Sequence, residues 1–235
     1  MELVKNGQTV IGWDPPGQTG LSENLKDNEG KPKRHTMVNY GEFQNELFNA
    51  LIEGKVNIIA MSMGGIPAAL FAGAHPDKVN KLVLADTFAT MKNRDFVQKV
   101  RGIWGSKLGR KQAIEESLSV IFNSLKLSPR ELSEAKNRFL QPYWIGDHLT
   151  SVAESFVDLI FTADASEACK KITAPTLLIA GKKDELAPVA EMEKLKALIP
   201  NAKLVTVDTL HTEILGNAVV FNSTSMVAIL DHLRN

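Results

Sequence analysis

Short apolar runs alternate with stretches of helical period along most of this 235-residue chain. Five runs predict strands, at residues 9–13, 56–61, 81–85, 176–180 and 202–207, and four of the five are rich in Val, Ile or Leu. Strands that alternate with amphipathic helices build a mainly parallel sheet with helices on both faces. The pattern therefore predicts the α/β fold class.

The segments between these runs carry apolar residues at helical spacing. Tyr40, Phe43, Leu47 and Leu51 form one such stripe, which stops at Gly54. Further helices are expected at residues 66–74, before Pro76, at residues 189–198, before Pro200, and at residues 226–233. We expect all four helices to pack on the sheet.

Residues 87–165 break the alternation, because they offer consecutive helical patterns and no strand. Apolar faces run over residues 96–104, 114–122 and 149–160, and Ser128-Pro129-Arg130-Glu131 is a capping box that predicts another helix start. An insertion that leaves the carboxyl end of a strand lies where ligands bind in open α/β sheets. We expect a sheet core at residues 1–86 and 166–235 and a four-helix cap at residues 87–165 that shapes a substrate pocket; the alternative is a packing role only.

Composition excludes several classes of function. The 27 Lys and Arg residues balance the 27 Asp and Glu residues, and no basic block is longer than residues 31–35, so neither nucleic acid nor an anionic membrane is an expected partner. Cys169 is the single cysteine, and no apolar run approaches the roughly 18 residues that a membrane helix needs. The first residues lack a signal-peptide core. A cytoplasmic protein is the expectation, and its oligomeric state stays open.

Ser62 stands where the second strand run gives way directly to a helical stretch. A strand that turns into a helix within about two residues strains the backbone and needs very small neighbours. Ala60, Gly64 and Gly65 meet that requirement. The pattern favours a nucleophilic serine, although a serine at such a junction also serves as a helix cap.

A serine nucleophile needs an imidazole to take its proton and an acid to orient that imidazole. Asp184 and His211 directly follow the fourth and fifth predicted strands, which places them at the same sheet edge as Ser62. Asp86, after the third run, is a rival for the acid. The remaining histidines have structural explanations in loops or at helix ends: His35, His75, His148 and His232.

These motifs resemble those of the α/β-hydrolase superfamily, in the branch with a helical cap after the sixth strand. The resemblance rests on Trp13-Asp14-Pro15-Pro16-Gly17 to Ser22, Ser62-Met63-Gly64-Gly65, residues 76–86, residues 175–184 and His211. It implies the α/β-hydrolase fold, and the chain is most similar to small esterases and 3-oxoadipate enol-lactonases. The loop from Asp14 to Ser22 is one residue longer than the family pattern, which leaves its shape open.

Acyl transfer also needs two N–H donors for the oxyanion. The resemblance assigns one donor to the amide of Met63 and the other to a loop upstream of residues 9–13, which this sequence does not contain. We therefore expect the chain to lack the N-terminal strands of its family, on the order of forty residues by usual element lengths.

The sequence thus predicts a serine hydrolase that cleaves a small-molecule carboxylic ester or lactone through an acyl-enzyme, with no metal or organic cofactor. Aromatic residues of the insertion are candidates for the pocket lining: Trp104, Phe122, Phe139, Tyr143, Trp144 and Phe156. The alternatives are a ligand-binding pseudoenzyme of the same fold, or a C–C bond hydrolase or acyltransferase that uses the same three residues.

Overall fold

The computed structural model describes residues 2–17, 23–91, 95–124, 129, 130, 133, 148–211 and 223–234. The chain divides into two compact units. The first unit comprises Met1–Gly12, Gly41–Ala89 and Asp164–Asn235, and the second comprises Trp13–Tyr40 and Thr90–Ala163.

The first unit is built on a four-stranded parallel sheet in the order β1-β2-β3-β4. Its strands are β1 (Val56–Met61), β2 (Val79–Ala85), β3 (Thr176–Gly181) and β4 (Ala202–Val207). The four predicted runs that lie here are confirmed, with β2 beginning two residues earlier than expected. Because the strands are parallel, their carboxyl ends meet at one edge of the sheet.

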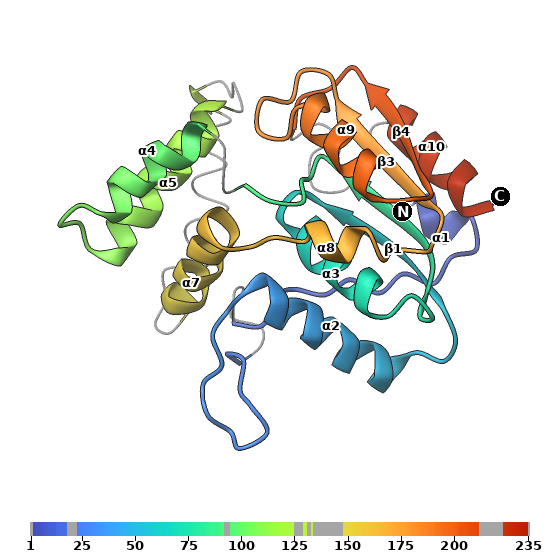
Figure 1. The fold of residues 1–235 in the computed structure, drawn as a ribbon, viewed down its shortest axis with the longest axis horizontal. Coiled ribbons are helices and arrows are strands. Elements are labelled where there is room, and N and C mark those ends of the chain that lie inside the picture. Colours follow the sequence, from blue (N-terminus) through green and yellow to red (C-terminus); the bar gives the residue numbers. More distant parts are fainter. Residues whose placement is uncertain are drawn as a thin grey trace. The chain divides into compact units, whose positions relative to one another are not determined.

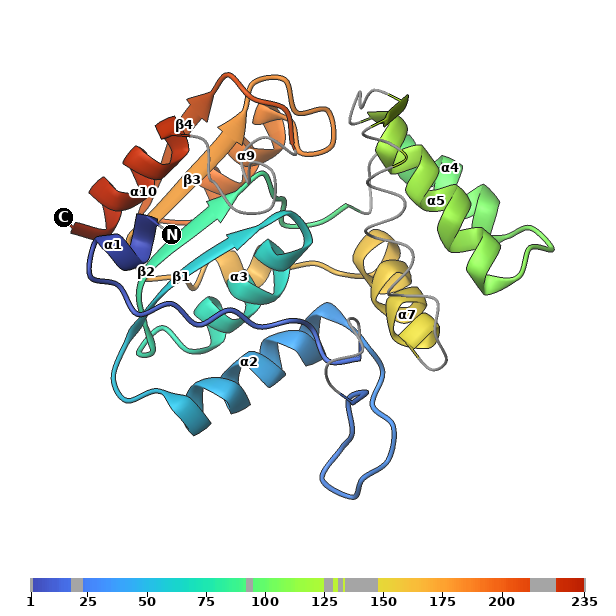
Figure 2. The same ribbon diagram turned by 180° about the vertical axis from the view of Figure 1, so that it is seen from behind.

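Helices cover both faces of this sheet (Figures 1 and 2). One face carries α3 (Gly65–Ala74), α8 (Ser166–Cys169) and α9 (Val189–Leu198), and the other carries α10 (Ser223–Arg234) with the short α1 (Glu2–Lys5). Successive side chains of the central strands point to opposite faces of the sheet. Val83 and Ile179 belong to the core cluster that includes Ile229 of α10. The predicted α/β class is confirmed.

The expected strand at residues 9–13 is wrong. These residues form no strand, and Val10 and Ile11 are 43% and 50% exposed. A strand needs a neighbour to pair its N–H and C=O groups, and among the described strands β1 pairs with β2 alone. Residues 9–13 pair with none of the described strands, so their apolar pattern is not sufficient to form a strand.

Helix α2 (Met37–Leu51) begins three residues before the predicted stripe. The side chain of Thr36 caps it, since the Asn39 N–H donates to Thr36 Oγ1 over 3.1 Å. The chain then turns at Gly54, whose φ of +86° suits glycine.

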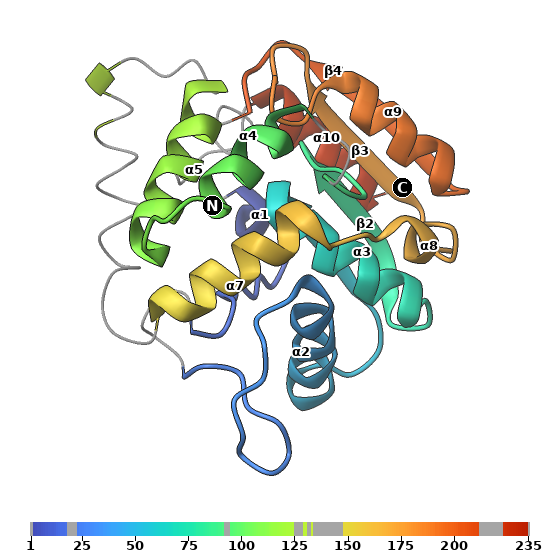
Figure 3. The same cartoon turned by 60° about the vertical axis from the view of Figure 1, so that its left-hand side comes forward.

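Within the described residues, the second unit contains three helices of the predicted insertion. These are α4 (Asp95–Trp104), α5 (Arg110–Ser124) and α7 (His148–Phe161), and α4 lies beside α5 (Figure 3). The helix expected from Ser128 lies largely outside the described residues. Residues 13–40 join this unit, although the sequence prediction assigned them to the core. The role of the unit as a substrate cap stays a prediction.

None of the helices that the structure describes combines the length and the apolar character that a membrane crossing requires.

Candidate active site

Ser62 occupies a strained turn between β1 and α3. The strand ends at Met61, the 3-10 turn η1 spans Ser62–Gly64, and α3 begins at Gly65. Ser62 has a φ of +50°, in the left-handed region that side chains rarely adopt. Backbone strain of this kind gathers at functional sites, and here it sits on the residue that the sequence singled out.

Thr87 supports this turn, and sequence reasoning missed it. Its hydroxyl donates to the Ser62 carbonyl over 2.7 Å. A Cβ added to Gly65 would lie 2.3 Å from Thr87 Oγ1, so the requirement for glycine comes from this neighbour. The available signal was the position of Thr87, two residues after the end of the predicted strand at residues 81–85.

Asp184 lies in the turn after β3 and is 4% exposed. Its Oδ1 atom accepts the N–H groups of Leu186 and Ala187 over 2.7 and 2.8 Å. Two backbone donors to one carboxylate oxygen stabilise the ionised form and fix the orientation of the group. The second oxygen, Oδ2, is then directed by this anchoring to His211.

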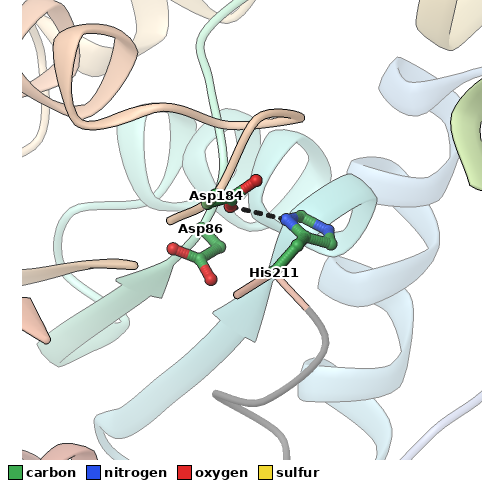
Figure 4. Close-up of side chains that lie close together, drawn as sticks. All are labelled: Asp86, Asp184 and His211. Atoms are coloured by element: carbon green, nitrogen blue, oxygen red, sulfur yellow. Dashed lines mark hydrogen bonds and ion pairs between the residues drawn. The ribbon is translucent and has the colours of Figure 1, made fainter. Parts of the chain in front are cut away.

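His211 follows β4 and joins the other two side chains. Its Nδ1 atom lies 2.7 Å from Asp184 Oδ2 (Figure 4), and its Nε2 atom lies 3.0 Å from Ser62 Oγ. A carboxylate can only accept, so Nδ1 carries the proton and donates it to Asp184. Nε2 of the neutral ring is therefore an acceptor for the Ser62 hydroxyl.

Close approach of the strand ends makes this geometry possible. A Cβ on Gly181, the last residue of β3, would lie 2.7 Å from the Thr209 carbonyl oxygen. Glycine at this point lets the segment that carries His211 lie against the turn that carries Asp184. All three side chains belong to the first unit.

A serine hydroxyl hydrogen-bonded to an imidazole, which is held in turn by a buried carboxylate, is the arrangement that activates serine for attack. The family model described as alpha/beta hydrolase fold matches residues 2–218. The chain belongs to this family.

This α/β-hydrolase is similar in sequence to known hydrolases. It is 27% identical over 222 residues to a poly(3-hydroxyalkanoate) depolymerase from Ectopseudomonas oleovorans, across 93% of this chain and 74% of the relative. It is 28% identical over 228 residues to a 2-hydroxy-6-oxononadienedioate/2-hydroxy-6-oxononatrienedioate hydrolase from Cupriavidus pinatubonensis, across 86% of this chain and 76% of the relative.

Among solved structures, the α/β-hydrolase is similar to the enol-lactonase from Burkholderia xenovorans. The TM-score is 0.68 at 19% identity, over 94% of this chain and 79% of that chain. This likeness supports the shared fold.

Asp86, the rival acid, lies beside the pair formed by Asp184 and His211, and the bond drawn from the imidazole in Figure 4 runs to Asp184. It is fully buried, and its Oδ1 atom accepts the Gly181 N–H over 2.7 Å. Burial raises the pKa of the Asp86 carboxyl from its ordinary value of 3.8 to about 8, and the charge of Asp184 adds to the rise. The structure thus brings His211 to Asp184 and not to Asp86.

Asp86, Asp184 and His211 also offer metal-binding atoms within 4.8 Å of one another. Both His211 nitrogens and both Asp184 oxygens are already engaged in hydrogen bonds. A metal ion would have to displace these bonds, so the arrangement fits proton transfer better than metal binding.

Cys169 offers no alternative nucleophile. It is fully buried, and burial raises the pKa of its thiol to about 12, with a further contribution from the charge of Asp164. The thiolate is the reactive form, and it is not populated near neutral pH.

The remaining predicted site residues stay predictions. Met63 is the second residue of η1, and its role as an oxyanion donor stays a prediction. The Trp104 indole N–H donates to Ser117 Oγ over 3.0 Å, and its ring stacks on Phe156 with centroids 6.3 Å apart. Tyr143, Trp144 and Phe139 lie outside the described residues, as does the side chain of Phe122.

Proposed function

We propose that this α/β-hydrolase cleaves a carboxylic ester or lactone through an acyl-enzyme. The observation that carries the proposal is the continuous hydrogen-bonded series from Ser62 Oγ through His211 to Asp184, with links of 3.0 and 2.7 Å. The similarity to an enol-lactonase is consistent with this substrate class.

The reaction follows from the geometry. Ser62 Oγ attacks the substrate carbonyl carbon while His211 Nε2 takes the hydroxyl proton, and Asp184 stabilises the imidazolium that results. The imidazolium then protonates the departing alkoxide, which leaves an acyl group on Ser62. Water that gives a proton to the same imidazole attacks the acyl carbon, releases the acid and restores the serine. In this scheme the Met63 amide donates to the oxyanion, and no step needs a metal or an organic cofactor.

Covalent labelling with a fluorophosphonate probe tests this function, because the probe reacts with an activated serine. We expect the folded protein to be labelled, Ser62→Ala to abolish labelling, and the exposed Ser106→Ala control to leave it intact. Asp184→Asn should slow the reaction by about 10⁴, since the amide favours the wrong tautomer of the imidazole. Folded wild-type protein that resists the probe would instead support the ligand-binding pseudoenzyme.

A substrate panel then separates the hydrolase classes. Aryl esters of rising acyl length and simple lactones should be turned over with release of the acid. The relative from Cupriavidus pinatubonensis suggests 2-hydroxy-6-oxononadienedioate as the competing substrate. Turnover of that compound alone would replace the ester and lactone assignment with C–C bond hydrolysis.

A further inference from the structure

Asp86 links the ends of two neighbouring strands. Its backbone N–H donates to the Ile179 carbonyl over 2.9 Å, and its side-chain Oδ1 accepts the Gly181 N–H over 2.7 Å. It also has a φ of +41°, which makes it, with Ser62, one of two side-chain-bearing residues with positive φ in the described part of the chain. The strain and the two bonds show that this carboxyl is held at one position.

The bond to Gly181 supports the turn that carries Asp184. The Asp184 N–H donates back to the Gly181 carbonyl over 3.2 Å, and the Lys182 N–H donates to the Val207 carbonyl over 2.8 Å. Gly181 is thus the first residue of a short turn whose last residue orients His211. Loss of the Asp86 acceptor would leave the Gly181 N–H buried without its partner.

The two carboxyls differ sharply in the donors that they receive. Asp184 accepts two backbone N–H groups and the His211 Nδ1–H. Asp86 accepts one N–H, and no N–H or O–H group of the described residues donates to its buried Oδ2. Two buried carboxyls at this separation do not both ionise readily, and hydrogen-bond donors favour the charged form. The difference in donors therefore favours Asp86 as the protonated member of the pair.

Within the described part of the chain, the groups that lie against Asp86 supply no compensating positive charge at rest. The end of β3 contributes Asp184, the segment after β4 contributes His211, and α9 contributes the uncharged Met192, whose sulfur accepts the Thr87 N–H over 3.4 Å. Oxygen and nitrogen atoms of Asp86, Asp184 and His211 lie within 4.8 Å of one another (Figure 4). The raised pKa of Asp86 agrees with this environment.

We propose that Asp86 is a positioning residue that acts as a neutral carboxylic acid: it holds the turn that carries Asp184 and leaves Asp184 as the single charged carboxyl beside His211. Its effect on rate rests on the proposed function. The protonation state itself is a property of the folded protein and does not depend on turnover.

The test compares three variants of the full chain. Asp86→Ala removes both the acceptor for Gly181 and the carboxyl proton, and should slow fluorophosphonate labelling of Ser62 by about tenfold, the scale of one lost buried hydrogen bond. Asp86→Asn keeps a neutral side chain with an oxygen acceptor, and should recover most of that loss. Asp208→Asn removes an exposed carboxylate from the end of β4 and serves as the matched control.

The pH dependence of labelling distinguishes a positioning role of the Asp86 carboxyl from a role in packing alone. Labelling of the wild type should change above a pH of about 8, where Asp86 ionises beside Asp184, and Asp86→Asn should lack this change while Asp208→Asn retains it. An Asn variant as slow as Asp184→Asn would overturn the proposal, because Asp86 would then act as a carboxylate. Identical pH profiles in all three proteins would also overturn it.

Infrared difference spectroscopy detects the proton on the Asp86 carboxyl directly. The C=O stretch of a protonated carboxylic acid should be present in the wild type near neutral pH and absent in Asp86→Asn. A missing band in the wild type overturns the inference even if the enzyme is active. A band in a protein whose Ser62 never reacts would overturn the proposed function and leave Asp86 assigned as a neutral acid.

Discussion

At the scale of single residues, the site depends on side chains that tolerate an unusual backbone or a very close neighbour. Ser62 accepts a φ of +50° because the Thr87 hydroxyl holds its carbonyl group over 2.7 Å. Gly65 is required by contact rather than by its own conformation, since its φ is −65°. The adjacent Gly64 has no such contact, so only Gly65 is required by a neighbour.

Gly65→Ala should destabilise the protein and disturb the Ser62 turn. The new Cβ would meet Thr87 Oγ1, Cβ and Cγ2 at 2.3, 2.7 and 2.8 Å. Overpacking of this kind costs about 1–3 kcal/mol. The matched control is Gly64→Ala, because no heavy atom lies within 4 Å of a Cβ there and its φ is −64°. Urea denaturation measures both; equal losses of unfolding free energy would contradict the contact argument.

At the scale of elements, two acidic side chains of α7 hold the start of α2 in the second unit. Asp158 Oδ2 accepts the Met37 N–H over 2.7 Å, and Glu154 Oε2 accepts the His35 N–H over 3.0 Å. These residues are four apart on α7, so they lie on one helical face. The first backbone N–H groups of a helix have no partner within it, and Asp158 of α7 supplies one for Met37 from a distant part of the sequence.

Asp158→Ala should loosen the first turn of α2. Loss of a charged acceptor from a helix start costs about 1–2 kcal/mol, and the Thr162 hydroxyl would lose its contact with the same carboxylate. Hydrogen exchange should accelerate at the Met37 amide, and the melting temperature should fall. Glu116→Ala on the exposed face of α5 is the control. Unchanged exchange at Met37 would show that Thr36 alone is sufficient to cap α2.

At the scale of the whole molecule, the buried carboxyl of Asp86 ties stability to pH. Its pKa is raised in the folded protein from 3.8 to about 8, so between these values the folded state holds a proton that the unfolded state has lost. Linkage then requires the contribution of Asp86 to stability to be fully present below 3.8 and to be lost as pH rises towards 8.

Asp86→Asn removes this dependence. We expect the unfolding free energy of the wild type to fall relative to the variant across that interval, with a limiting slope of about 1.4 kcal/mol per pH unit for one proton. Denaturant titrations at matched pH values measure the difference. Parallel stability curves for the two proteins would place the ionisation of Asp86 outside the interval.

The local pattern of apolar and turn residues predicts the strands and the order of the three site residues. Apolar runs bounded by turn residues located β1, β3 and β4 to within one residue, because a buried strand and the turn after it both leave a local signature. The order Ser62, Asp184, His211 followed from the same positions, since parallel strands present their carboxyl ends at one edge. Residues 9–13 show where pattern fails: their alternation suits a strand, but a strand exists only with a partner.

The sequence alone determined the family, the parallel sheet and the three side chains that converge on it. Only the tertiary structure decided which acid meets His211, because Asp86 and Asp184 both follow strands and differ in the donors that reach them. The sequence pattern also did not predict the contact of Thr87 with Gly65 or the capping of α2 by Asp158. Such contacts join residues far apart in the chain, and their strength depends on burial and distance, which no local pattern encodes.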